Sequence, residues 1–130
     1  MTEPLRITGK IEHGKGLGKT VGMPTANLRI DDVCQLPEYG VYATRIFVGE
    51  QGYDSVTNIG MRPSVDGEET VTVETYIFDF AGDIYGEVVR LEVYEYLRPT
   101  QKFQGIEEVQ KQVEKDVKNA KKYLDTIKAT

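Results

Sequence analysis

The residues best suited to chemistry lie in a glycine- and lysine-rich segment that runs into the sequence Pro-Thr-Ala-Asn at 24–27. Glycines such as Gly14 let backbone N–H groups approach an anion closely, and Lys19 adds a positive charge. Thr25 and Asn27 then offer oxygen atoms of the kind that Mg²⁺ prefers. We interpret the segment as a loop for the phosphates of a nucleotide, with a magnesium ion beside it.

The same segment comes close to a nucleotide-binding P-loop but departs from it. The pattern G-x-x-x-x-G-K-[ST] requires glycine where this chain has His13, and Gly22 and Pro24 interrupt the helix that must follow. A solvated surface hairpin is the alternative, with Thr25 and Asn27 as turn residues. Extended geometry around Pro24 puts those two side chains on one side of the chain, and spacing alone leaves both interpretations open.

A carboxylate suited to general-base work lies in a strand-like stretch, Val71–Phe80. Alternation along this stretch gives two faces: Glu74 shares one with Thr72, Tyr76, Phe78 and Phe80, and the other holds Val71, Val73, Thr75 and Ile77. Partial desolvation among aromatic side chains is a useful property for a base that works near neutral pH. The alternative is a solvent-facing glutamate on an edge strand, and position alone does not decide between the two.

The pattern of elements predicts the framework that must hold these groups. Stretches rich in β-branched and aromatic residues predict strands at Leu5–Ile11, Val41–Val48, Tyr53–Ile59, Val71–Phe80 and Glu87–Leu97. We expect the second and third of these strands to form one hairpin and the last two to form another. Several strands before any clear helix predict an all-β barrel or sandwich.

Apolar residues at helical spacing predict one amphipathic helix over about 106–127, lying against the strands. By length we expect a single domain over residues 1–130. A net charge of −5 argues against general nucleic-acid binding, and no apolar run is long enough to cross a membrane. One cysteine, Cys34, and the lack of a signal-peptide pattern favour a cytoplasmic location.

Several motifs, in order along nearly the whole chain, resemble those of the riboflavin kinase (flavokinase) family. They are Gly22-Met-Pro-Thr-Ala-Asn27, Leu36-Pro-Glu-Tyr-Gly-Val-Tyr42, Asn58-Ile-Gly-Met-Arg-Pro63, Val73-Glu-Thr-Tyr-Ile77, Ile84-Tyr-Gly-Glu87 and Tyr96-Leu-Arg-Pro99, with Lys102-Phe103 beyond. The resemblance implies a six-stranded antiparallel Greek-key barrel with a C-terminal amphipathic helix. That fold agrees with the elements expected from the residues themselves.

On the nucleotide side, the resemblance assigns roles to positions that match the family's motifs. Gly14 and Lys19 belong to a flap over the ATP phosphates, and Tyr85 matches a nucleotide contact. Thr25 and Asn27 match the positions that hold both the nucleotide and Mg²⁺, with Zn²⁺ or Mn²⁺ as alternative metals.

On the acceptor side, Glu74 matches the catalytic base for the ribityl 5′-hydroxyl. Arg98, Gln101 and Phe103 fall where the family contacts the flavin. The implied reaction transfers the γ-phosphoryl group of ATP to riboflavin and gives FMN and ADP. We expect a monomer whose partners are these small molecules, with no nucleic acid and no membrane.

Two alternatives to this prediction stay open. One is a non-catalytic flavin- or nucleotide-binding β-barrel, and the other is the detached kinase half of a bifunctional FAD-synthesis enzyme. No adenylyltransferase domain is recognised in the chain, so FAD synthesis is not predicted. The starting methionine and the helical end favour a complete small protein.

Overall fold

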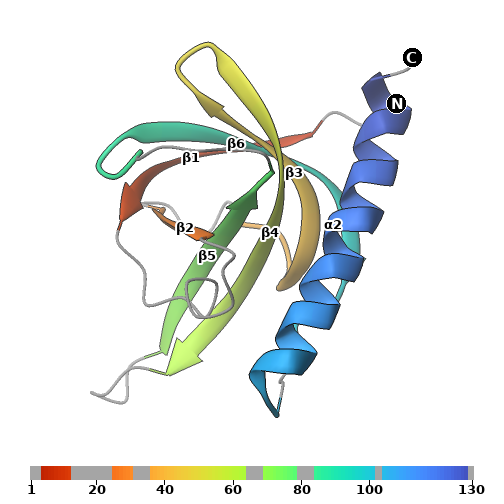
Figure 1. Ribbon diagram of the computed structural model, residues 1–130. Helices are drawn as coiled ribbons and strands as arrows, with labels where there is room; N and C mark the ends of the chain where they lie inside the picture. The colour runs from red at the N-terminus through yellow and green to blue at the C-terminus, as the bar shows by residue number, and fades with distance from the viewer. Residues whose placement is uncertain are drawn as a thin grey trace.

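The computed structural model describes residues 4–12, 25–30, 36–63, 69–78, 84–101 and 104–128 of the chain. The described strands close into an antiparallel barrel, and a long helix lies along its outer wall (Figure 1). In chain order these elements are β1 (Leu5–Glu12), β2 (Thr25–Arg29), β3 (Gly40–Val48), β4 (Gln51–Pro63), β5 (Glu69–Ile77), β6 (Val88–Arg98) and α2 (Ile106–Lys128). The predicted six-stranded barrel with a C-terminal helix is confirmed.

The strand order around the barrel is β1-β2-β5-β4-β3-β6, which confirms one predicted hairpin and corrects the other. In the β3–β4 hairpin Val48 pairs with Gln51, and Gly49 between them adopts a φ of +62°. The predicted hairpin between the stretches 71–80 and 87–97 is wrong. Both edges of β5 are already occupied by β2 and β4, so β6 crosses over and pairs with β1 and β3.

The barrel interior is an apolar core formed by alternate residues of every strand. In β1, for example, Ile7 and Ile11 are buried while their polar neighbours are exposed, as expected for a strand with one face on a core. The members of this core are Ile7, Ile11, Leu28, Tyr42, Ile46, Ile59, Val73, Ile77, Val89, Leu91 and Val93. This alternation fixes which positions of each strand point outwards, and the candidate site depends on that.

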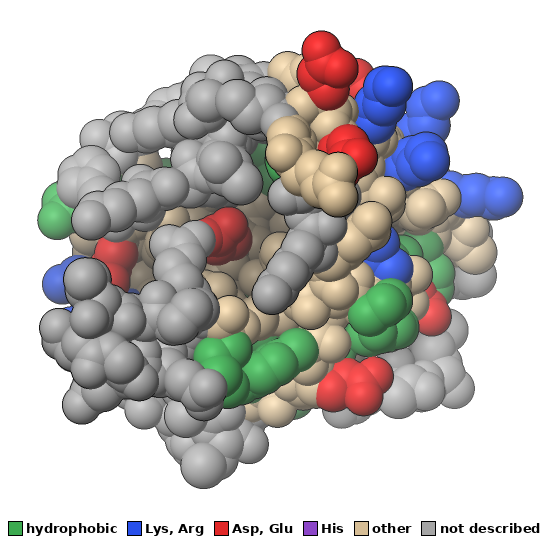
Figure 2. All heavy atoms as spheres, turned by 90° about the horizontal axis from the view of Figure 1, so that it is seen from below, with side chains coloured by type: hydrophobic (Ala, Val, Ile, Leu, Met, Phe, Trp, Pro, Cys, Tyr) green, Lys and Arg blue, Asp and Glu red, His purple; other side chains and the backbone are tan. Residues whose placement is uncertain are grey.

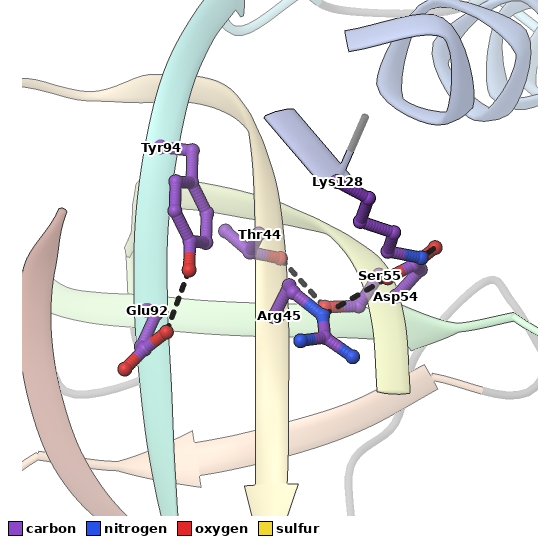
Figure 3. A network of polar contacts seen from close by, with 7 residues as sticks. All are labelled: Thr44, Arg45, Asp54, Ser55, Glu92, Tyr94 and Lys128. Carbon is purple, nitrogen blue, oxygen red and sulfur yellow. Dashed lines mark hydrogen bonds and ion pairs between the residues drawn. The ribbon is translucent and has the colours of Figure 1, made fainter. Parts of the chain in front are cut away.

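A chain of buried hydroxyl groups crosses the same interior. Thr44 lies 2.7 Å from Ser55 and 2.8 Å from Thr57, and Thr57 lies 2.9 Å from Thr75, measured between side-chain oxygens. All of these residues are fully buried. The chain links β3, β4 and β5 and satisfies hydroxyls that would otherwise be costly to bury. Figure 3 shows the Thr44–Ser55 contact.

Helix α2 covers the outer wall of the barrel at β3 and β4 (Figure 1). Ala120 and Leu124 are fully buried against a second apolar cluster that includes Val41, Ala43 and Val56. Val117 and Ile127 pack at its border, which confirms the amphipathic stripe predicted from the sequence. Within the part of the chain that the structure describes, no helix combines the length and the apolar character that a membrane crossing needs.

Candidate functional site

Glu74 lies in the middle of β5 with its side chain on the outer face of the barrel. Its chain neighbours Val73 and Thr75 are buried inside, at 2% and 0% exposure, so alternation turns Glu74 outwards. The residue is half-buried, and β5 is flanked by strands on both sides. The alternative of a solvent-facing glutamate on an edge strand therefore does not hold.

Strand register places an asparagine on each side of this carboxylate. Asn27 of β2 is opposite Glu74 across one edge of β5, and Asn58 of β4 is opposite it across the other. Directly opposite residues on one face of an antiparallel pair have Cβ atoms about 5 Å apart. A carboxylate and two amides thus stand side by side on the outer wall.

The same row continues around the barrel to the predicted flavin side. Asn58 pairs with Val41 of β3, and Val41 pairs with Arg98 at the end of β6. The row from Asn27 through Glu74 to Arg98 therefore crosses β2, β5, β4, β3 and β6 in the order in which they adjoin. With strands about 4.8 Å apart, the predicted base lies three spacings, or roughly 14 Å, from Arg98.

The Asn27 side chain has an unsatisfied polar atom that favours a ligand at this position. Its terminal nitrogen is buried and has no hydrogen-bond partner among the described residues. The nitrogen and oxygen of such an amide are assigned from their surroundings, so the atom facing the site can equally be the oxygen. Since buried polar groups are normally satisfied, the residue suits a position that a metal–nucleotide group completes. The backbone of Thr25 lies two residues earlier in β2, opposite Tyr76.

Tyr85 lies in a turn that is hydrogen-bonded to the end of β1. This places it at the end of the row where Asn27 lies. The amide of Gly86 donates to the carbonyl of Ile11 at 2.9 Å, and the amide of Ile11 donates to Glu87 at 2.9 Å. Gly86 adopts a φ of +83°, which a glycine accepts without strain. The next residue of β1, Glu12, pairs with Asn27. Tyr85 itself is 54% exposed.

Arg98 is held by a carboxylate that sequence reasoning left without a role. Its Nε donates to Asp116 of α2 at 2.8 Å and its Nη2 donates to the other carboxylate oxygen at 2.7 Å. Asp116 is only 4% exposed, and Gln112 donates a further hydrogen bond to it at 3.1 Å. A sequence signal existed, because position 116 lies beside Val113 and Val117 on the apolar stripe of α2. The pair ties the end of β6 to the helix.

The loop between β6 and α2 comes back against β4 close to Asn58. A Cβ added to Gly60 would meet the Thr100 methyl group at 3.5 Å, so the loop lies over the glycine. Gln101 follows in this loop and is exposed. The loop that carries the predicted flavin residues therefore lies over Gly60. Gly60 is two positions after Asn58 in β4, and Asn58 is the residue opposite Glu74.

Three predicted residues, Gly14, Lys19 and Phe103, lie outside the described residues, as does the Thr25 side chain. Within the described ranges there is no group of three or more His, Cys, Asp or Glu residues that could hold a metal ion. Mg²⁺ is commonly held by few protein ligands together with substrate phosphates.

Seen from below, one acidic side chain lies in a hollow of the molecule, and Lys and Arg side chains gather where α2 lies (Figure 2).

Besides the interior Thr44–Ser55 contact, Figure 3 shows polar contacts that involve none of the predicted site residues. Burial tends to raise the pKa of Glu92, but hydrogen bonds from Tyr94 and Arg6 and the charge of Arg90 outweigh it and lower that pKa. Tyr94 donates to Glu92 at 2.6 Å, and burial together with this bond raises the pKa of Tyr94 to about 12.

A separate hollow of about 390 Å³ lies between the β3–β4 hairpin and the end of α2. Its Asp54 is ion-paired with Arg45 at 3.0 Å and with Lys128 (Figure 3). None of the predicted site residues that the structure describes lines this hollow.

Comparison with known proteins shows the family and the fold. A family model described as flavokinase, riboflavin kinase, matches residues 1–124. A bifunctional riboflavin kinase/FMN adenylyltransferase from Bacillus subtilis is 35% identical over 128 residues, covering 97% of this chain and 40% of that protein. The chain thus spans about 40% of the length of such curated relatives.

Two solved structures are similar over most of the chain. Riboflavin kinase from Trypanosoma brucei superposes with a TM-score of 0.67 at 25% identity, covering 95% of this chain and 82% of that one. A Streptococcus pneumoniae chain described as a macrolide-efflux protein gives a TM-score of 0.82 at 33% identity, covering 91% of this chain and 38% of that one.

Proposed function

This chain belongs to the flavokinase family, and we propose that it is a riboflavin kinase. In the proposed reaction it transfers the γ-phosphoryl group of ATP to the 5′-hydroxyl of riboflavin and releases FMN and ADP. The observation that supports this best is the row on the outer wall, in which Glu74 stands between Asn27 and Asn58. The relatives' second activity, FMN adenylyltransfer, is not part of the proposal.

The nucleotide would lie on the β1–β2 side of Glu74. Tyr85 is exposed on a turn fastened there, and the buried, unsatisfied amide of Asn27 faces the same region. We assign Gly14 and Lys19 to the phosphates from the sequence motif alone. Thr25 and Asn27 would hold Mg²⁺, which offsets the negative charge on the phosphates when it is bound.

Riboflavin would lie on the β4–β3 side of Glu74, with its ring toward the loop that starts at Arg98. Arg98 is fixed by Asp116, and the loop passes over Gly60 before it reaches Gln101 and Phe103. The primary hydroxyl of the substrate then points at Glu74 from the side opposite to the nucleotide, as an in-line displacement requires.

In the proposed chemical step Glu74 acts as the general base. The 5′-oxygen of riboflavin forms a bond to the γ-phosphorus while the bond between that phosphorus and the bridging oxygen of ADP breaks. The hydroxyl proton passes to the Glu74 carboxylate, and the electron pair of the broken bond leaves with ADP. Positioning and charge stabilisation by the surrounding groups supply most of the acceleration in reactions of this class.

The direct test is a product assay with the chain as it stands. Purified protein, riboflavin and Mg-ATP are mixed, and FMN and ADP are separated by liquid chromatography; omission of Mg²⁺ with added chelator tests the metal. We expect FMN and ADP in equal amounts and only with metal present. Binding of riboflavin without any FMN would favour the alternative, a non-catalytic binding barrel.

We also propose a cytoplasmic location and a monomer, which fractionation and gel filtration test.

A further inference from the structure

Asn58 occupies a position in the row that the proposed roles leave unused. It lies between the predicted base and the helix-covered part of the wall, with Glu74 opposite on one side and Val41 opposite on the other. The Asn58 side chain is exposed, although Val41 and Val56 beside it on the outer face are buried at 2% and 7%. Asn58 therefore stands exposed at the border between the polar row and the helix-covered part of the wall.

The surroundings of Asn58 leave room above it. The next outward position along β4 is Gly60, which has no side chain; among the described residues, a Cβ placed there would meet only the Thr100 methyl group, at 3.5 Å. None of the hydrogen bonds or ion pairs within the described ranges engages the Asn58 amide. The amide can donate two hydrogen bonds and accept two, and a ligand lying over Gly60 would meet it.

The proposed substrate has a polyol chain that must cross this position. With the primary hydroxyl at Glu74 and the flavin ring toward the loop after Arg98, the chain between them runs from β5 over β4. One strand spacing, about 4.8 Å, separates Glu74 from Asn58 in that direction. The part of the substrate over Asn58 is thus the run of secondary hydroxyls.

We propose that Asn58 binds the secondary hydroxyls of the ribityl chain and thereby selects a polyol acceptor. The inference rests on the proposed function and deepens it, because it names the part of the substrate that this residue recognises. A site built to hydrogen-bond a hydroxyl discriminates strongly against an analogue without it, since its own polar group is then left without a partner.

The test compares two acceptors in two variants. Riboflavin is compared with a flavin analogue whose side chain is an ω-hydroxypentyl group, which keeps the primary hydroxyl and lacks the secondary ones. We expect Asn58→Ala to lower kcat/KM for riboflavin by roughly 5- to 100-fold, the effect of one or two lost hydrogen bonds. For the analogue the change should stay below about threefold, because the contact is already absent. Asn119→Ala, the same substitution on the exposed face of α2, should change neither value.

Two results would overturn the inference: an equal loss with both acceptors, which marks a structural role, and an unchanged kcat/KM for riboflavin. Asn58→Val, which suits a strand better than alanine and has no hydrogen-bonding group in its side chain, repeats the comparison if thermal melting shows that Asn58→Ala is poorly folded. If the wild-type protein makes no FMN, the proposed function fails. The affinities of the two flavins, measured by flavin fluorescence, then still test the Asn58 contact. Asn58→Ala should weaken the binding of riboflavin and leave the binding of the analogue nearly unchanged.

Discussion

The buried pair of Arg98 and Asp116 yields a prediction that links stability to the flavin side of the site. Asp116→Asn removes the negative charge and keeps the shape of the side chain. The Arg98 guanidinium then loses a partner that accepts hydrogen bonds at 2.8 and 2.7 Å. The two side chains are 18% and 5% exposed, so water cannot fully replace the lost carboxylate.

The size of the effect follows from this burial. Breaking a buried ion pair by removing one partner costs about 3–5 kcal/mol. Since Arg98 retains some contact with water, we expect Asp116→Asn to lower the free energy of unfolding by about 2–4 kcal/mol. Replacing both residues, with Arg98→Met and Asp116→Leu, should cost about 2 kcal/mol less than the sum of the single substitutions.

Urea denaturation followed by circular dichroism measures these values. Asp125→Asn, an exposed aspartate in the same helix, is the matched control and should change stability by less than about 0.5 kcal/mol. In steady-state assays Asp116→Asn should raise KM for riboflavin more than KM for ATP, because Arg98 starts the loop on the flavin side. A loss under about 1 kcal/mol, or strictly additive single and double variants, would refute the reasoning.

Three further predictions concern single side chains. Asn27→Ala should change the free energy of unfolding by less than about 1 kcal/mol, because the buried side-chain nitrogen has no partner among the described residues. The same substitution should weaken Mg-ATP binding at least about tenfold in calorimetry. A large loss of stability with normal ATP binding argues against the assignment. Thr57→Val breaks the buried hydroxyl chain and should cost about 1–3 kcal/mol in urea denaturation, and an unchanged midpoint contradicts this. The pKa of Tyr94 is raised to about 12, which means that the fold favours the neutral phenol. The contribution of Tyr94 to stability is therefore complete below the unfolded pKa of about 10 and is lost as pH rises from 10 toward 12. Tyr94→Phe should flatten that decline when both proteins are unfolded in urea across this range, and parallel curves would show that Tyr94 is not its source.

The helix and every strand except β2 were predictable because each has its own local signal, whereas β2 was expected only as extended chain after Pro24. Alternation in the stretch around Glu74 correctly put it on the face opposite to Val73 and Thr75, and the apolar repeat in α2 gave the helix and its buried stripe. The partner of β6 was not predictable in this way. Turn residues between two strands favour a hairpin locally, but pairing is decided by which strand edges remain free once the barrel closes, and that is a property of the whole chain.

The candidate site was predictable as a set of residues and only partly as an arrangement. Glu74 and Asn27 are far apart in sequence, and nothing in their spacing says that they stand directly opposite one another. The family resemblance brought them together, and strand register then added Asn58 between Glu74 and the helix-covered wall. Asp116 was missed because an aspartate on an apolar stripe has no local signal for its partner, which lies on a different element.

The proposed role of Glu74 is tested most directly by a single-turnover measurement on Glu74→Gln. Protein in excess is mixed with riboflavin and ATP carrying a labelled γ-phosphate, and the label in FMN is followed by rapid quench. Loss of a general base typically costs about 10²- to 10⁴-fold in rate, and we expect a fall of that size with riboflavin and Mg-ATP binding nearly unchanged. Glu114→Gln, an exposed glutamate of α2, is the control. A rate close to that of the wild type would contradict the account.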